Sequence, residues 1–167
     1  TSTEQLTPRK RVVVAMSGGV DSSLAAALAA EEGFEVIGVT MHLSGSTSRC
    51  CSLDDVEDAR QVAKKLGVRF FVANYADEFQ KEVIEVFADS YAAGRTPIPC
   101  VACNKRFKFD HLLARANVFG ASRVATGHYA RIDRHPDTGA LRLWRARDLQ
   151  KDQTYFLFQL DQEQLAQ

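Results

Sequence analysis

The chain has 167 residues, 46% hydrophobic and 25% charged, which is the size and composition of one globular domain. Ten glycines and four prolines exclude collagen-like and low-complexity sequence, and without an apolar run of 18 residues we expect no membrane contact. Basic and acidic residues are equal at 21 each, yet residues 94–151 hold twelve basic and only four acidic ones. This asymmetry points to a polyanionic partner, although solvated helix faces would explain it equally well.

The first half of the chain predicts alternating strands and helices. Residues 11–16 form an apolar, β-branched run, typical of a strand buried on both faces of a sheet. In the helix that follows, Val20, Leu24 and Leu28 recur on one face, which we expect to pack on the sheet. The next elements are a strand over 36–40, a helix over 56–66, a strand over 68–73 and a long helix over 79–91.

The second half begins with two prolines in residues 96–99, which interrupt the regular alternation. After them we expect a helix over 109–116, a short strand over 124–126, and a hairpin of 129–132 with 141–144. Trp144 and Phe156 are interpreted as core residues rather than as platforms for base stacking. Alternating strands and helices predict an α/β fold with a doubly wound, mostly parallel sheet and an appended β-hairpin.

The domain boundaries follow from these elements. Residues 1–10 are expected to be a tail without the features of a signal peptide, and residues 11–160 a single domain. Asp161 and Gln164 resemble a helix start, so residues 161–167 are expected to open a helix that is cut off after one turn.

The four cysteines predict reactive thiols rather than a disulfide framework. Cys50 and Cys51 are adjacent, and Cys100 and Cys103 form a Cys-x-x-Cys pair. In an α/β enzyme such spacing is typical of redox, metal or nucleophile chemistry, so a cytoplasmic location is expected.

A phosphate site is predicted where the first strand ends. Gly18 and Gly19 would let the backbone approach an anion, and the N-terminus of the following helix would add its dipole. Ser17, Ser22 and Ser23 would add hydroxyl donors. No lysine follows the glycines, so the loop is neither a Walker A loop nor a Gly-x-Gly-x-x-Gly loop.

The string Ser-Gly-Gly-Val-Asp-Ser over residues 17–22 resembles the PP-loop of the N-type ATP pyrophosphatases, whose fold is adenine nucleotide α-hydrolase-like. Further motifs come in order: Gly-Arg-Thr-Pro (94–97), Pro-Cys-Val-Ala-Cys-Asn-Lys (99–105), Ala-Thr-Gly-His-Tyr (125–129) and Lys-Asp-Gln-Thr-Tyr-Phe-Leu (151–157). Together they closely resemble the N-terminal domain of the tRNA-specific 2-thiouridylases, whose later domains and second reactive cysteine lie beyond the residues matched.

The resemblance implies a function and its participants. ATP and Mg²⁺ would adenylate the C2 carbonyl of the wobble uridine in tRNA. A cysteine-bound sulfur, supplied by a persulfide donor protein, would then replace the oxygen, releasing AMP and pyrophosphate. The alternatives are another PP-loop ATP-dependent ligase and an ATP-binding module without turnover.

The resemblance also implies site residues. Those for ATP are Ala15, Met16, Ser17, Gly18, Gly19, Val20, Asp21, Ser22, Met41 and Gly127, with Asp21 also holding Mg²⁺. Those for tRNA are Ile98, Pro99, Cys100, His128, Lys151, Asp152 and Gln153. The catalytic residue is Cys103, while Ile98 and Cys100 stand where the family usually has Asn and often Asp.

Three roles stay open for the cysteine pair, the weakest being a zinc site shared with Cys50 and Cys51. Cys103 as a persulfide carrier is favoured, because relatives with Asp at the position of Cys100 do not need two cysteines. Alternatively, Cys100 and Cys103 would hold an edge of an iron–sulfur cluster, which requires further ligands.

Overall fold

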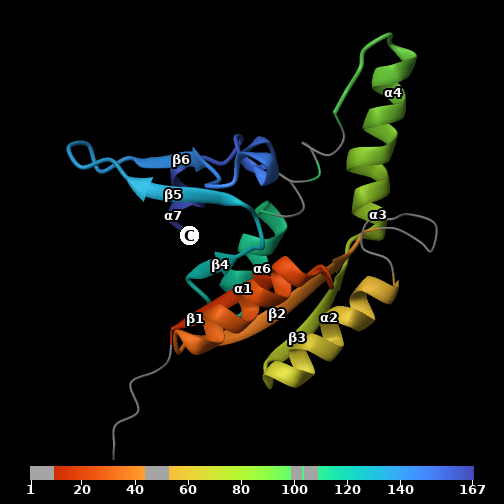
Figure 1. Cartoon of the computed structure of the whole chain (residues 1–167). Helices are drawn as coiled ribbons and strands as arrows, with labels where there is room; N and C mark the ends of the chain where they lie inside the picture. The colour runs from red at the N-terminus through yellow and green to blue at the C-terminus, as the bar shows by residue number, and fades with distance from the viewer. Residues whose placement is uncertain (1–9, 44–52, 99–102, 104–108) are drawn as a thin grey trace, which may run out of the picture.

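The centre of the computed structural model, which describes residues 10–43, 53–98, 103 and 109–167, is a four-stranded parallel sheet (Figure 1). Its strands are β1 (Arg11–Ala15), β2 (Glu35–His42), β3 (Arg69–Asn74) and β4 (Arg123–Ala125), in the order β3-β2-β1-β4. Val13 of β1 lies opposite Ile37 of β2 on one side and Val124 of β4 on the other. The chain therefore winds outward from β1 to β3 and returns to the opposite side of β1, which creates a switch point between β1 and β4.

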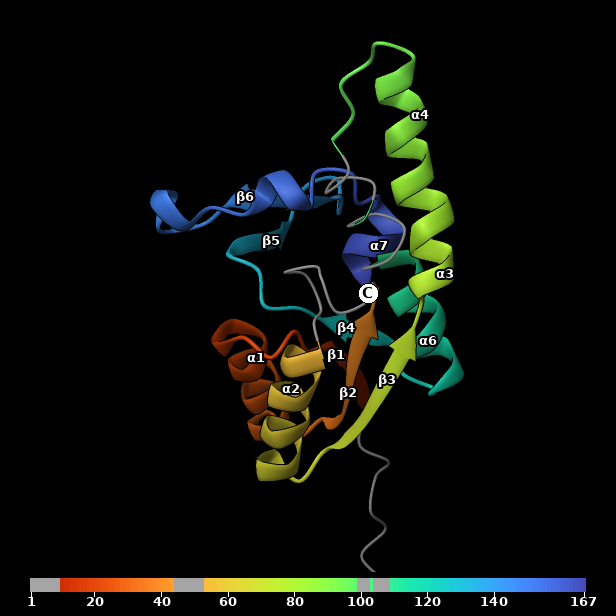
Figure 2. The ribbon, with the colours of Figure 1, turned by 90° about the vertical axis from the view of Figure 1, so that its right-hand side faces the viewer.

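Helices cover both faces of this sheet, as the doubly wound prediction requires. Val12 and Val14 pack with residues of α1 (Val20–Glu31) and α2 (Leu53–Leu66), whereas Val13 packs with residues of α6 (Leu112–Val118). Figure 2 shows α1 and α2 on one side of the sheet and α6 on the other. The apolar run of β1 is thus explained, because its alternate side chains enter two separate cores.

The prediction for the packed face of α1 is wrong. Val20, Leu24 and Leu28 are 77%, 56% and 48% exposed, and the buried residues of this helix are Ser22 and Ala26. The sheet instead receives the alanine face of the helix: Ala25, Ala26, Ala29 and Ala30. Small side chains let the helix axis approach the sheet closely, and this turns the leucine face toward solvent.

The long predicted helix is observed as three consecutive segments. These are α3 (Ala76–Phe79), a π-helical segment (Gln80–Glu85) and α4 (Val86–Ala92), and the helix stops at Gly94, whose φ is +71°. In Figure 1 it rises from the end of β3 beyond the edge of the sheet, which agrees with the burial of Val83 alone among its residues.

The predicted hairpin is confirmed as β5 (Ala130–Arg134) and β6 (Leu141–Arg145), but it forms a separate two-stranded sheet. Trp144 on β6 is 44% exposed, so its assignment to the core is wrong. Two 3₁₀ turns follow, Leu149–Lys151 and Thr154–Phe156, and then α7 (Gln162–Ala166).

The expected helix start at Asp161 is confirmed. Its carboxylate accepts from the backbone N–H of Gln164 at 2.8 Å, and the Gln164 side chain accepts from the N–H of Asp161 at 3.1 Å, which makes a capping box. Within the described part of the chain, no helix combines the length and apolar character needed to cross a bilayer.

Candidate functional site

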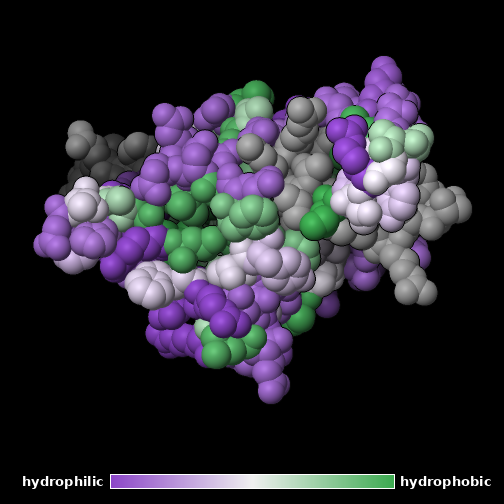
Figure 3. Space-filling view, turned by 90° about the horizontal axis from the view of Figure 1, so that it is seen from above, coloured by the Kyte–Doolittle hydropathy of each residue, from purple (hydrophilic) through white to green (hydrophobic). Residues whose placement is uncertain are grey.

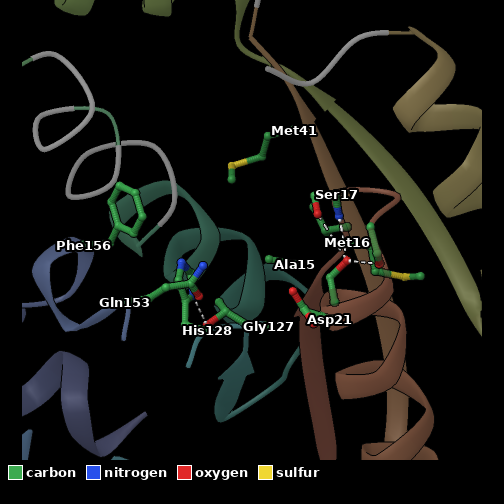
Figure 4. Close-up of a pocket in the computed structure, with 13 residues that line it drawn as sticks. Ala15, Met16, Ser17, Asp21, Met41, Gly127, His128, Gln153 and Phe156 are labelled. Carbon is green, nitrogen blue, oxygen red and sulfur yellow. Dashed lines mark hydrogen bonds between the residues drawn. The ribbon is translucent and has the colours of Figure 1, made fainter. Parts of the chain in front are cut away.

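A cavity of about 270 Å³ lies at the carboxyl ends of β1, β2 and β4, which is the switch point of the sheet. Its lining comes from four separate stretches of the chain: Ala15, Met16, Ser17, Gly19, Asp21, Ser22, Val39, Met41, Thr126, Gly127, His128, Gln153 and Phe156. Figure 4 shows the end of β1 and the start of α1 on one side of this space, with His128, Gln153 and Phe156 on the other. The structure therefore brings together most of the residues expected to bind ATP with two of those expected to bind tRNA.

The loop after β1 is held in shape by serine hydroxyls. Ser22, which is 5% exposed, donates to the carbonyl of Gly19 at 3.1 Å and accepts from the N–H of Ser17 at 3.1 Å. Ser23 donates to the same Gly19 carbonyl at 2.8 Å. The expectation that Ser22 offers its hydroxyl to a ligand is therefore replaced by an internal role, in which it fixes the turn that begins α1.

The start of α1 carries no side-chain cap. Gly19 occupies the N-cap position, and the first helical hydrogen bond runs from the N–H of Ser23 to the Gly19 carbonyl at 3.2 Å. The N–H groups before Ser23 lack intrahelical acceptors, so the helix end presents donors and a positive dipole to the cavity. Such an end favours an anionic ligand.

Two glycines allow the close packing that builds this site. Gly18 has φ of +78°, and a Cβ there would lie 2.5 Å from the carbonyl oxygen of Asp55 at the start of α2. A Cβ on Gly127 would lie 2.5 Å from the backbone nitrogen of Ser22. The loop after β4 thus rests directly on the first turn of α1, a contact only glycine permits.

Asp21 lines the cavity from the first turn of α1. Its Oδ1 accepts a hydrogen bond of 3.0 Å from the hydroxyl of Tyr129, the residue that follows Gly127 and His128. A carboxylate at the mouth of a phosphate site suits Mg²⁺, which takes one or two carboxylates and completes its shell with phosphate and water oxygens. Asp21 therefore fits the expected metal role, and Tyr129 orients its carboxylate.

The opposite wall combines an imidazole, an amide and a phenyl ring. His128 is fixed by a 2.8 Å contact between its Nδ1 and the hydroxyl of Thr126, and its ring lies 6.4 Å from the Phe156 ring. Gln153 is tied to Tyr129 twice, because its N–H donates to the Tyr129 carbonyl and its side chain accepts from the Tyr129 N–H, both at 3.0 Å. These contacts join the segment after β6 to the loop after β4.

Asp152 and Lys151 do not line the cavity. The carboxylate of Asp152 accepts from the N–H of Ala146 at 2.7 Å and from the Thr154 hydroxyl at 2.6 Å. Thr154 first, then the Ala146 N–H and nearby Arg145, hold the pKa of Asp152 below its ordinary value. Asp152 thus anchors the turn that presents Lys151, whose ammonium lies 5.5 Å from the Tyr129 ring centroid.

Cys103 lies beside the cavity rather than in its lining. It is half-buried and packs against the apolar cluster that includes Val39 and Met41, two residues of the cavity wall. Ile98 is 67% exposed and does not line the cavity. Pro99 and Cys100, and also Cys50 and Cys51, lie outside the described residues.

Three lining residues were missed by sequence reasoning: Val39, Thr126 and Phe156. Thr126 and Phe156 belong to motifs quoted for the resemblance, so their position beside Gly127 and Gln153 was an available signal. Val39 carried no such signal, because its sequence context is that of any residue in a buried strand. Over residues 10–43, 53–98, 103 and 109–167, no three His, Cys, Asp or Glu side chains gather in a way that could hold a metal ion.

A glycine turn that opens a helix at the switch point of a doubly wound parallel sheet defines a nucleotide-binding α/β domain. The family is fixed by a match over residues 10–167 to the family model described as "tRNA methyl transferase HUP domain". The chain belongs to this family.

Curated relatives carry a more specific name. The chain is similar to the "tRNA-specific 2-thiouridylase MnmA" of Geobacter metallireducens, with 55% identity over 168 residues, and to that of Heliobacterium modesticaldum, with 52% over 164 residues. These matches cover 95% of this chain but only 45% and 43% of the two relatives. The chain thus spans less than half the length of these relatives.

Solved structures share the fold. An NMN synthetase from Francisella tularensis matches with a TM-score of 0.51 and 21% identity, over 72% of this chain and 47% of that one. A glutamine-dependent NAD⁺ synthetase from Acinetobacter baumannii, solved with ADP, matches with a TM-score of 0.50 and 25% identity, over 71% and 22% of the two chains. Both likenesses support the α/β class expected from the sequence.

Proposed function

We propose that this chain is the catalytic ATP-binding domain of a tRNA 2-thiouridylase. The observation that carries the proposal is the cavity that the PP-loop shares with His128 and Gln153, two residues whose motifs belong to the thiouridylase pattern. The names of the similar proteins, one for methyl transfer and the others for thiolation, have tRNA modification in common. The PP-loop and the adjacent cysteine favour thiolation.

In the first step the O2 oxygen of the wobble uridine attacks the α-phosphorus of ATP, and pyrophosphate leaves. The donors at the start of α1 hold the departing phosphates, and Gly18 and Gly19 let the backbone approach them. Asp21 would hold Mg²⁺, which would neutralise charge on the phosphates. Tyr129 keeps the Asp21 carboxylate turned toward the cavity.

In the second step sulfur replaces the activated oxygen. The terminal sulfur of a persulfide on Cys103, loaded by a donor protein, attacks C2, and AMP leaves with the former O2. The thiol of a second cysteine then attacks the Sγ atom of Cys103. The bond between this atom and the transferred sulfur breaks, so 2-thiouridine is released and a disulfide joins the two cysteines. We favour this persulfide route over an iron–sulfur cluster held by Cys100 and Cys103. We propose a cytoplasmic location for this reaction.

The test measures pyrophosphate release, AMP release and 2-thiouridine in tRNA, with a persulfide donor present. We expect pyrophosphate release to require tRNA, Asp21→Ala to abolish it, and Cys103→Ser to retain it while forming no 2-thiouridine. Asp89→Ala, which removes an exposed carboxylate of α4 outside the lining, is the matched control for Asp21→Ala. Pyrophosphate release that ignores tRNA would indicate a small-molecule ligase, and nucleotide binding without release would indicate a sensor.

A further inference from the structure

The β5–β6 hairpin is rich in arginine, and both of its ends adjoin the cavity. Residues 130–147 contain five arginines and two aspartates. β5 starts two residues after His128, and the chain after β6 leads to Gln153, so both ends of the hairpin adjoin cavity residues. Figure 1 shows the hairpin beyond the carboxyl ends of the parallel strands, and Figure 3 shows mainly hydrophilic residues over its outer part.

One face of the hairpin gathers Arg131, Asp133, Arg142 and Trp144, because Arg131 pairs with Trp144 and Asp133 with Arg142 across the two strands. Arg142 makes two hydrogen bonds of 2.7 Å to the Asp133 carboxylate, and its guanidinium carbon lies 5.1 Å from the centroid of the Trp144 ring. Trp144 nevertheless keeps 44% of its surface exposed.

The indole is held in place although it is exposed. Hydrogen bonds from Arg142, and next from the indole N–H of Trp144, hold the pKa of Asp133 below its ordinary value, and the carboxylate orients both of these partners. Arg131 is fixed by a 3.0 Å hydrogen bond from its Nε to the Arg145 carbonyl. A preoriented aromatic face loses little side-chain entropy when a planar ligand stacks on it.

We propose that Trp144 and Arg131 bind an unpaired nucleotide of the tRNA, adjacent to the one that enters the cavity. The inference rests on the proposed function and adds a second RNA subsite to it. Arg131 is three residues beyond His128 on a chain that bends at Tyr129, so the backbone positions of these two residues are at most about 11 Å apart and the subsite adjoins the cavity wall. The indole stacks on the base, which any base allows, and the guanidinium of Arg131 contacts the phosphate.

Trp144 is the only tryptophan of the chain, so its fluorescence reports this subsite directly. We expect saturable quenching by tRNA and by a single-stranded oligouridylate, and none by heparin, a polyanion without bases. Binding of labelled tRNA, followed by anisotropy, that leaves the fluorescence unchanged would overturn the subsite while the proposed function stood. A blue shift that follows protein concentration and ignores RNA would assign the face to protein contacts and also overturn it.

Substitutions give the second arm of the test. Trp144→Ala should weaken tRNA binding at least about fivefold, and Trp144→Phe should retain most of the affinity. Tyr91→Ala is the matched control, because Tyr91 is an aromatic residue that is 55% exposed and belongs to α4. Figure 1 shows this helix on the other side of the molecule from the hairpin. ATP affinity should stay unchanged in all three variants. Wild-type tRNA affinity in Trp144→Ala would overturn the subsite, whereas pyrophosphate release that ignores tRNA would count against the proposed function alone.

Discussion

The two glycines of the loop after β1 differ in what a methyl group would meet. At Gly18, alanine would adopt φ of +78° with its Cβ 2.5 Å from a backbone oxygen, whereas at Gly19 the nearest atom is the Ser17 hydroxyl at 3.6 Å. We expect Gly18→Ala to lower the free energy of unfolding by at least about 1 kcal/mol. Gly19→Ala should fold normally and bind ATP more weakly, because its methyl group stands where phosphates approach.

Thermal denaturation and calorimetric titration with ATP separate these two effects. Each of the two variants, Gly18→Ala and Gly19→Ala, is the control for the other, because both add the same methyl group at neighbouring positions. Unchanged ATP affinity in Gly19→Ala would contradict the assignment of this loop to phosphate.

At the residue scale the sequence was informative wherever a motif was local. The glycines, Asp21 and Ser22 are contiguous, so their proximity needed no tertiary structure, and only the inward use of the Ser22 hydroxyl had to be seen. The bond between Asp21 and Tyr129 spans 108 residues and is made by the return of β4 to the side of β1. No local pattern encodes such a contact.

Helix α1 shows how element predictions fail. Periodicity identified the helix correctly but selected its larger apolar residues as the packed face, although the sheet receives alanines. The spacing of hydrophobic residues indicates which residues share a face of a helix. It does not indicate how closely that helix packs on the sheet. Where the helix packs closely, the smaller residues turn inward.

This packing predicts opposite outcomes for two substitutions on the same helix. Ala26→Leu adds three carbons at a position with no exposed surface, so we expect a loss of about 1–3 kcal/mol in the free energy of unfolding. Leu28→Gln, at a residue that is 48% exposed, should change it by less than about 0.5 kcal/mol. Urea denaturation of both variants measures the difference, and a larger loss for Leu28→Gln would contradict the observed orientation of α1.

The turn between β6 and the cavity should show a pH dependence. The pKa of Asp152 is lowered in the folded state, so its contribution to stability is present above the ordinary value of 3.8 and is lost as the pH falls through the lower, folded-state pKa. Asp152→Asn should therefore lower Tm at pH 7, and its deficit should shrink below pH 3.8. Asp137→Asn, in the hairpin turn, is the control. If the difference in Tm between Asp152→Asn and the wild type grew as the pH fell, the stabilising role of the charged Asp152 carboxylate would be contradicted.

At the scale of the whole molecule, charge is divided along the chain. The segment 94–151 carries a net charge of +8 on a chain with no net charge. We expect tRNA affinity to fall steeply as salt rises, and Lys151→Ala to lower the slope of log affinity against log salt by about one. Lys64→Ala, an exposed lysine of α2, should leave the slope unchanged. Affinity that ignores salt would contradict a polyanionic partner.

The strand order sets a sequence of events during synthesis. β1 emerges first, yet one of its two neighbours, β4, lies more than a hundred residues later, and Gln153 and Phe156 follow later still. A nascent chain on the ribosome can therefore pair β1 with β2, and β2 with β3, early, while the edge of β1 that awaits β4 stays open. The cavity closes only when the 126–128 loop and the segment beyond the hairpin have left the exit tunnel. We expect chains that stall before that point to expose one unpaired edge of β1 and to lack the late-formed walls of the cavity.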